Sequence, residues 1–128
     1  MHADLTQVDR AGGDEPVGGR GGDDDDLPGD LARQFEGRDH GSTVSFYVGR
    51  FPPGTGPPLH RHPYEETFIV QEGSATFTID GHALEVGAGQ IVVVPAAAAH
   101  RFVATGVTDL RQVSVHPRDR MVQEDIGS

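Results

Sequence analysis

Two short segments of the sequence carry metal-ligating side chains at regular spacing. Within residues 54–73, His60, His62 and Glu66 form the pattern H-x-H-x3-E. Successive side chains of an extended strand alternate between its two sides, so these three positions share one side. His100 follows a second apolar run, in the segment GQIVVVPAAAAH. Three imidazoles and one carboxylate form a ligand set, and we predict a metal site built from these four residues.

The donor types restrict the metal without identifying it. The chain has no cysteine, so nitrogen and oxygen atoms must hold the ion, which we expect to be one divalent transition metal: Fe, Mn, Ni, Co, Cu or Zn. An octahedral ion with four protein ligands keeps two positions open for substrate or O₂. A tetrahedral zinc ion with four protein ligands would be closed and structural.

The same two segments resemble the two sequence signatures of the cupin superfamily. Residues 54–73 match every position of the first signature, G-x5-H-x-H-x3/4-E-x6-G. The second signature, G-x5-P-x-G-x2-H-x3-N, is matched at three positions, Gly89, Pro95 and His100. Ala97 stands where glycine is usual, just before His100, and Ala104 stands where asparagine is usual. The first departure concerns a turn, and the second removes a polar group that is not a ligand.

This resemblance, over residues 34–118, implies a fold and a range of functions. It implies an all-β, single-domain cupin jelly-roll β-barrel with a metal held by His60, His62, Glu66 and His100. The chain is similar to small single-domain bacterial cupins. Cupins include dioxygenases, isomerases, decarboxylases, cyclases, lyases, storage proteins and ligand-sensing domains, so the resemblance does not choose a reaction.

Short apolar runs separated by turn residues independently predict an all-β sandwich or barrel. The expected strands are residues 42–51, 66–71, 75–79, 82–86, 91–94, 101–103 and 110–115. Asp80-Gly81 is typical of a hairpin turn. Residues 52–58 (PPGTGPP) are expected to be a rigid connector. Residues 121–126 lack a clear period, and they are interpreted either as a frayed end or as a segment that packs on a partner.

Charge and composition divide the chain in two. Residues 1–30 contain nine acidic residues against two arginines, which is −7 of the net charge of −10. They also contain seven glycines and few large apolar residues, so we predict a disordered tail over residues 1–28 and a barrel over residues 29–128. The negative charge argues against nucleic acid and anionic membranes as partners. No membrane span or signal peptide is evident, and we expect a cytoplasmic protein.

Strand parity predicts the interior of the barrel. Phe68 and Val70 follow Glu66 on its side, and Phe102 follows His100. The expected pocket walls are Phe68, Phe77, Phe102 and either Phe46 or Tyr47, although such side chains also fill small barrels simply by packing. Tyr64 shares the parity of the ligands. It is interpreted either as a general acid or base or as a rim residue that covers the pocket.

Several nearby polar residues are assigned to other places. Glu65 has the opposite parity to Glu66 and is expected to point away from the site. The remaining histidines of the barrel are expected at the surface: His40, His82 and His116. Either Arg111 or Gln112 must face inward, and the neighbouring valines favour the side of Arg111.

The outward parity of Thr67, Ile69 and Val92 leaves apolar surface outside the barrel, which favours a homodimer of stacked sheets.

Two functions remain open from the sequence. The first is a metal-dependent enzyme acting on a small organic molecule, either oxygenase-like or a non-redox cyclase, isomerase or lyase. The four-residue ligand set favours it. The second is a non-catalytic domain that binds or senses a small molecule, with a structural or ligand-orienting metal. The short chain and the absence of an evident second acid–base pair favour this alternative.

Overall fold

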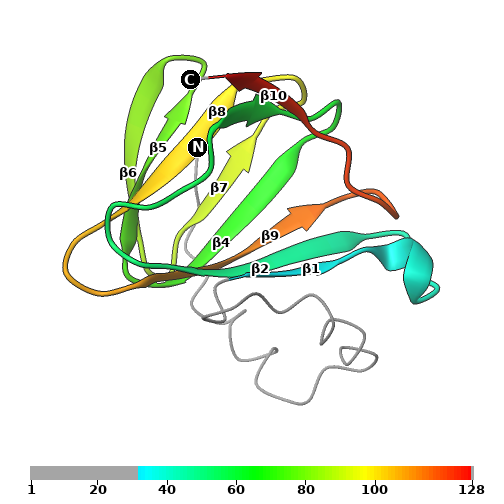
Figure 1. Cartoon of the computed structure of the whole chain (residues 1–128), viewed down its shortest axis with the longest axis horizontal. Helices are drawn as coiled ribbons and strands as arrows, with labels where there is room; N and C mark the ends of the chain where they lie inside the picture. Colours follow the sequence, from blue (N-terminus) through cyan, green and yellow to red (C-terminus); the bar gives the residue numbers. More distant parts are fainter. Residues whose placement is uncertain (1–31, 128) are drawn as a thin grey trace.

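The computed structural model describes residues 32–127, which form two five-stranded sheets packed face to face (Figure 1). The sheets have the strand orders β1-β2-β9-β4-β7 and β10-β3-β8-β5-β6. The strands are β1 (Ala32–Phe35), β2 (Ser45–Phe51), β3 (Leu59–Arg61), β4 (Glu66–Glu72), β5 (Ser74–Ile79), β6 (His82–Gly87), β7 (Ile91–Val94), β8 (His100–Thr105), β9 (Leu110–His116) and β10 (Glu124–Gly127), with one 3₁₀ turn, η3 (Gly37–Asp39). All the pairings given for the described strands are antiparallel. The predicted all-β jelly-roll architecture is confirmed.

The interior between the sheets is built by side chains at alternate strand positions. On β4, Glu66, Phe68 and Val70 are buried, while the residues between them are only partly buried. The rings of Phe68, Phe77 and Phe102 pack against one another with centroids 4.9–5.8 Å apart. Full burial of each such side chain contributes about 1.5–3 kcal/mol to folding. The predicted parity of β4 is therefore confirmed, and it directs the first residue of this strand into the barrel.

The hairpin between β5 and β6 follows from its turn residues. Asp80 and Gly81 both have positive φ angles, of 48° and 84°, as a two-residue type I′ turn requires. Ile79 pairs with His82 next to the turn, and this is one of six residue pairs between β5 and β6. The predicted hairpin is confirmed.

Three short strands, β1, β3 and β10, were not predicted from the sequence. Strand β3 follows a proline-rich connector and has only three residues, so it has too few positions to show a period. It pairs with β8 through His60 and His100 and with β10 on its other side. Residues of β10 are exposed, and an ion pair of 3.0 Å between Arg61 and Glu124 supports the pairing. The C-terminal segment thus packs on the barrel of its own chain.

The predicted outward position of Val92 is wrong. Val92 is fully buried, whereas its neighbour Val93 is 38% exposed. Val92 is paired in register with Phe68, and paired residues of adjacent strands point to the same face. A run of four apolar residues, as in β7, gives no alternation from which the inner face can be chosen.

No helix within residues 32–127 has the length and apolar character needed to cross a membrane. The predicted disordered tail, and its boundary with the barrel after residue 28, lie outside the described residues.

Candidate metal centre

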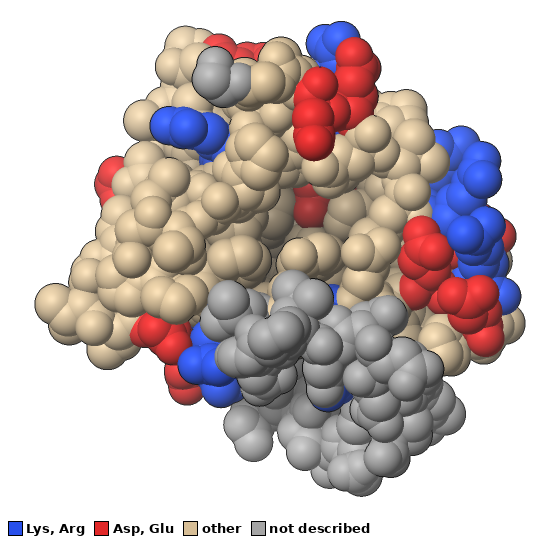
Figure 2. Space-filling model, in the orientation of Figure 1, with Lys and Arg blue, Asp and Glu red and all other residues tan. Residues whose placement is uncertain are grey.

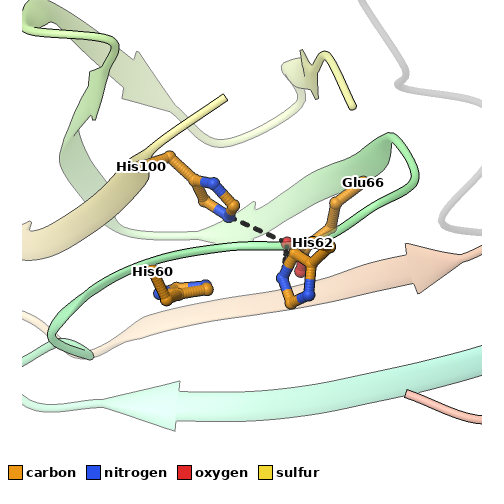
Figure 3. Close-up of side chains that lie close together, drawn as sticks. All are labelled: His60, His62, Glu66 and His100. Atoms are coloured by element: carbon orange, nitrogen blue, oxygen red, sulfur yellow. Dashed lines mark hydrogen bonds and ion pairs between the residues drawn. The ribbon is translucent and has the colours of Figure 1, made fainter. Parts of the chain in front are cut away.

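The structure brings His60, His62, Glu66 and His100 together inside the barrel (Figure 3). Each residue offers a ligand atom within 4.8 Å of the others, and all four side chains are buried. They belong to both sheets. His60 lies on β3 directly opposite His100 at the start of β8, and Glu66 begins β4 in the other sheet. The site therefore bridges the two layers of the fold.

Backbone carbonyls determine which ring nitrogen of each histidine points to the centre. The Nδ1 atoms of His60, His62 and His100 lie 2.7–2.9 Å from the carbonyl oxygens of residues 58, 122 and 98, respectively. A carbonyl oxygen can only accept, so each Nδ1 must donate a hydrogen. In a neutral imidazole the lone pair is then on Nε2. The protein thus directs three Nε2 lone pairs towards the shared centre.

The donor set fits a divalent metal. The Nε2 atom of His62 is buried and lacks a properly oriented hydrogen bond, although it lies 3.0 Å from the Glu66 carboxylate. The Nε2 atom of His100 is also 3.0 Å from the same oxygen. Nitrogen and carboxylate oxygen atoms this close must share a positive charge, which a proton supplies in the metal-free protein and a divalent cation can supply in its place. Carbonyl-oriented histidines of this kind are typical of metal ligands. The buried group could therefore bind a metal.

The carboxylate of Glu66 is held in its charged form. Burial would raise the pKa of Glu66, but contacts with His100, His116 and His62 outweigh burial and hold this pKa far below its ordinary value of 4.5. Glu65 is exposed, as the opposite parity of this residue predicts. Glu66 can therefore offer a negative charge to a cation throughout the physiological pH range.

The environments of His60 and His62 differ. Burial lowers the pKa of His60, and the nearby His100 and His62 rings add to this effect. Burial also acts to lower the pKa of His62, but its contacts with Glu66 and with the Val122 carbonyl raise that pKa overall. The lowered pKa keeps His60 neutral and available as a ligand at neutral pH.

The predicted surface position of His116 is wrong. His116 is buried, and its Nε2 atom lies 3.1 Å from the second carboxylate oxygen of Glu66. Its Nδ1 atom lies 2.7 Å from the hydroxyl of Tyr64, which also accepts a hydrogen bond from the backbone N–H of Val122. His116 therefore contacts the carboxylate directly, and Tyr64 holds His116 in place. The inward position of His116 could have been predicted from alternation along β9, where Gln112, Ser114 and His116 alternate with valines.

A cavity of about 540 Å³ adjoins the candidate metal centre. His60, His62, Glu66 and His116 form part of its wall. Figure 2 shows a hollow in this face of the molecule, with mainly uncharged walls and an acidic group deep inside. The aromatic residues on the wall are Tyr47, Phe51, Phe68 and Phe102. A ligand in this cavity would therefore contact the candidate metal centre and an apolar wall together.

Phe68 and Phe102 thus lie where the pocket was predicted, whereas Phe46 and Phe77 are not among the described residues that line this cavity. Phe77 is fully buried in the core behind the other two rings. Phe46 packs on Phe35. Its neighbour Tyr47, the alternative weighed for the same strand, does line the cavity.

The inward residue of the pair Arg111 and Gln112 is Gln112. It is buried and lines the cavity, whereas Arg111 is exposed and lies 3.4 Å from Glu72 in an ion pair. The valines at 113 and 115 lie on the outer face with Arg111. Both faces of this sheet carry apolar side chains, which explains why the sequence pattern favoured the wrong side.

Comparison with known proteins agrees with this fold and site. Residues 47–116 match the family model of the cupin domain, which is more than half of the 128 residues. The chain therefore belongs to the cupin family.

Two known proteins illustrate the relationship. Auxin-binding protein 1 of Arabidopsis thaliana is 32% identical over 84 residues, which are 59% of this chain and 42% of that protein. The structure of oxalate decarboxylase from Bacillus subtilis at pH 4.6 superposes with a TM-score of 0.68 at 23% identity, covering 74% of this chain and 27% of the other. A structure from work on the Mn(II) centres of the same enzyme matches with the same values. The likeness to the decarboxylase shows a shared fold. The chain spans less than half the length of either protein.

Proposed function

We propose that this cupin binds one divalent transition metal through His60, His62, Glu66 and His100, and that it is a metal-dependent enzyme acting on a small organic molecule. The observation that carries the proposal is the set of three Nδ1-to-carbonyl hydrogen bonds, which direct the Nε2 atoms towards one carboxylate at a cavity wall. The similarity to a decarboxylase with Mn(II) centres supports manganese among the candidate ions, beside Fe, Ni, Co, Cu and Zn.

The residues of the chain would perform distinct tasks in such an enzyme. A bound ion would supply Lewis-acid or oxygen-activating chemistry. Glu66 would offset part of its charge, while His116 and Tyr64 keep the carboxylate oriented. The aromatic wall, including Phe68 and Phe102, would exclude water and strengthen electrostatic interactions at the site. Oxygenase-like chemistry is the leading candidate, followed by non-redox cyclisation, isomerisation or elimination.

One observation favours the alternative of a non-catalytic small-molecule-binding or sensing domain. Among the described residues, Glu66 is the one acidic residue on the cavity wall, and it is held by three histidines. The hydroxyl of Tyr64 is occupied by His116 and by the Val122 N–H. Within the described residues, the cavity wall therefore offers no second carboxylate, and the hydroxyl of Tyr64 is already paired.

The metal assignment is tested by comparing two double variants purified without metal-affinity resin. His60→Ala with His100→Ala removes two proposed ligands, whereas His40→Ala with His82→Ala removes two exposed histidines as a matched control. We expect close to one metal ion per chain in the wild type and in the control, and its loss from the first variant. Equal metal content in all three proteins would contradict the site.

Catalysis is tested on the metal-loaded wild type. O₂ uptake and product masses would be followed with catechols, diketones and flavonols, using the metal-depleted protein as control. Metal-dependent turnover of any of these classes supports the enzyme. A protein that binds metal and small molecules without turnover supports the binding alternative.

We also propose that the chain forms a homodimer through the outer face of the sheet that contains β2 and β7. Val48 on β2 and Val93 on β7 are 43% and 38% exposed, and Val113 and Val115 lie between them on the same face. Val48→Glu should convert a dimer to a monomer in light scattering. A wild type that is already monomeric would contradict this proposal.

A further inference from the structure

One polar side chain on the cavity wall lacks a partner. Gln112 is 3% exposed, and its Oε1 atom forms no hydrogen bond in the described structure. Its register partners in the adjacent strands are Gly49 and Val70, neither of which has a polar side chain. Buried polar atoms are nearly always paired, and leaving one unpaired is costly. A partner supplied from the cavity would account for this amide.

The other polar residues of the same row on β9 are already paired. Ser114 and His116 approach each other at 3.3 Å, and His116 also contacts Glu66 and Tyr64. Gln112 is thus the residue of this row on β9 whose hydrogen-bond acceptor, Oε1, is unpaired. Its terminal amide turns about a soft torsion, so the oxygen can turn towards a molecule in the cavity.

Two aromatic rings, Phe51 and Phe102, line the cavity with Gln112, together with the polar side chains of Tyr47 and Ser114. The ring of Phe51 lies so close to Gly49 that a Cβ atom at residue 49 would collide with it. Phe51 packs edge-on against Phe102, with centroids 5.0 Å apart, and both rings line the cavity. These rings favour a ligand with an apolar, flat body.

The wall also excludes some ligands by charge. No lysine or arginine lines the cavity within residues 32–127, and its carboxylate, Glu66, is already surrounded by histidines. A dicarboxylate would bury at least one anionic group without a cationic side chain, which is unfavourable. Without a bound metal, the cavity therefore disfavours small dianions.

We propose that this cavity takes an uncharged, mainly aromatic or alicyclic molecule with one O–H or N–H group, and that this group donates a hydrogen bond to Oε1 of Gln112. The inference rests on the proposed function, because it assigns a ligand class to the cavity beside the candidate metal centre. Gln112 is a specificity-determining residue in this assignment, and the contact itself requires no metal.

The test uses the full chain, both metal-loaded and after EDTA treatment, in protein-observed NMR titrations. The probes are 2-naphthol, which has a donor, 2-methoxynaphthalene, which has nearly the same shape without the donor, and oxalate. We expect 2-naphthol to bind both forms about three- to tenfold more tightly than 2-methoxynaphthalene, the range for one neutral hydrogen bond. Oxalate should not bind the EDTA-treated form. Equal affinities for the two naphthalenes, or oxalate binding in this cavity without metal, would overturn the proposal.

The residue assignment is tested with Gln112→Met, which keeps the length of the side chain, and Gln34→Met as a matched control. Gln34 lines the same cavity but is exposed. Gln112→Met should remove the preference for 2-naphthol and raise the melting temperature of the ligand-free protein, because an unpaired buried acceptor disappears. Gln34→Met should retain the preference.

A retained preference in Gln112→Met, or a lowered melting temperature, would overturn the role of Gln112. Metal content and turnover are measured on the same samples. A failure of the metal centre with intact naphthol selectivity is therefore distinguishable from a failure of the ligand assignment.

Discussion

The turn that delivers His100 to the site contains an alanine in a glycine conformation, and we predict that Ala97→Gly stabilises the protein. Ala97 has a φ angle of +68°, in the left-handed region, and it occupies the position at which the cupin signature has glycine. Its N–H donates to the carbonyl of His62 at 2.7 Å. The turn therefore connects two of the candidate metal ligands, and the strain at Ala97 is maintained by this contact.

The expected gain is the difference between two opposing effects. The left-handed conformation costs an alanine about 1–2 kcal/mol relative to glycine. Glycine gives the unfolded chain more freedom, which costs about 0.4–1 kcal/mol. The methyl group of Ala97 is exposed, so its loss removes little packing. We expect a net gain of about 0.5–1 kcal/mol, which corresponds to roughly 2–6 °C in melting temperature for a domain of this size.

The assay is urea unfolding and thermal melting of metal-depleted protein, with Ala96→Gly as the matched control. Ala96 is the adjacent exposed residue and has no positive φ angle, so glycine there should destabilise by about 0.4–1 kcal/mol. The midpoint should move in opposite directions for the two variants with an unchanged m-value. Destabilisation by Ala97→Gly, equal to that by Ala96→Gly, would refute the proposed backbone strain at this turn.

Three further predictions concern the carboxylate at the centre of the site. Glu66→Gln should weaken metal binding by more than about tenfold in chelator competition, whereas the exposed Glu65→Gln should leave it unchanged; the opposite result would mean that the strand register is wrong. His116→Phe leaves the second oxygen of Glu66 without its partner, so metal affinity should fall by about tenfold or more. Tyr64→Phe should cause a smaller loss. Unchanged metal affinity in both variants would contradict the role of these residues in orienting Glu66. The depressed pKa of Glu66 contributes stability that is present above pH 4.5 and lost as pH falls further. Metal-free wild type should therefore lose up to about 1.4 kcal/mol per pH unit more than Glu66→Gln in acid unfolding, and parallel curves would contradict this coupling. The raised pKa of His62 acts in the opposite sense, because its stabilisation is present below the unfolded value of 6.5 and is lost as pH rises through the folded value.

Local sequence spacing was sufficient to indicate the ligand set and much of the fold. His60, His62 and Glu66 are close in sequence, and their residue types alone indicated the set. The expectation that alternation along one strand places them on one side is wrong, because the chain bends at residues 63–64 and Glu66 begins a strand of the other sheet. Asp80-Gly81 specified its hairpin through backbone preferences of two residues. Such features depend on neighbours in the chain, and little tertiary information is needed to predict them.

The identity of the inner face of β7 and β9 was decided by the tertiary structure. Val92 faces inward because it pairs with Phe68, and Gln112 faces inward because it pairs with Val70. Both strands carry apolar residues on both faces, so hydrophobic alternation could not select one register. Pairing with β4 selects it, because one face of that strand begins with the buried Glu66.

The sequence by itself therefore indicated the donor set of the candidate site, since three of the four candidate ligands lie within seven residues of one another. Only the tertiary structure revealed what surrounds that site. His116 reaches Glu66 from β9, 50 residues further along the chain, and the Val122 carbonyl orients His62 from a C-terminal segment with no sequence period. Contacts between distant segments depend on how the two sheets pack, and no local pattern specifies that packing.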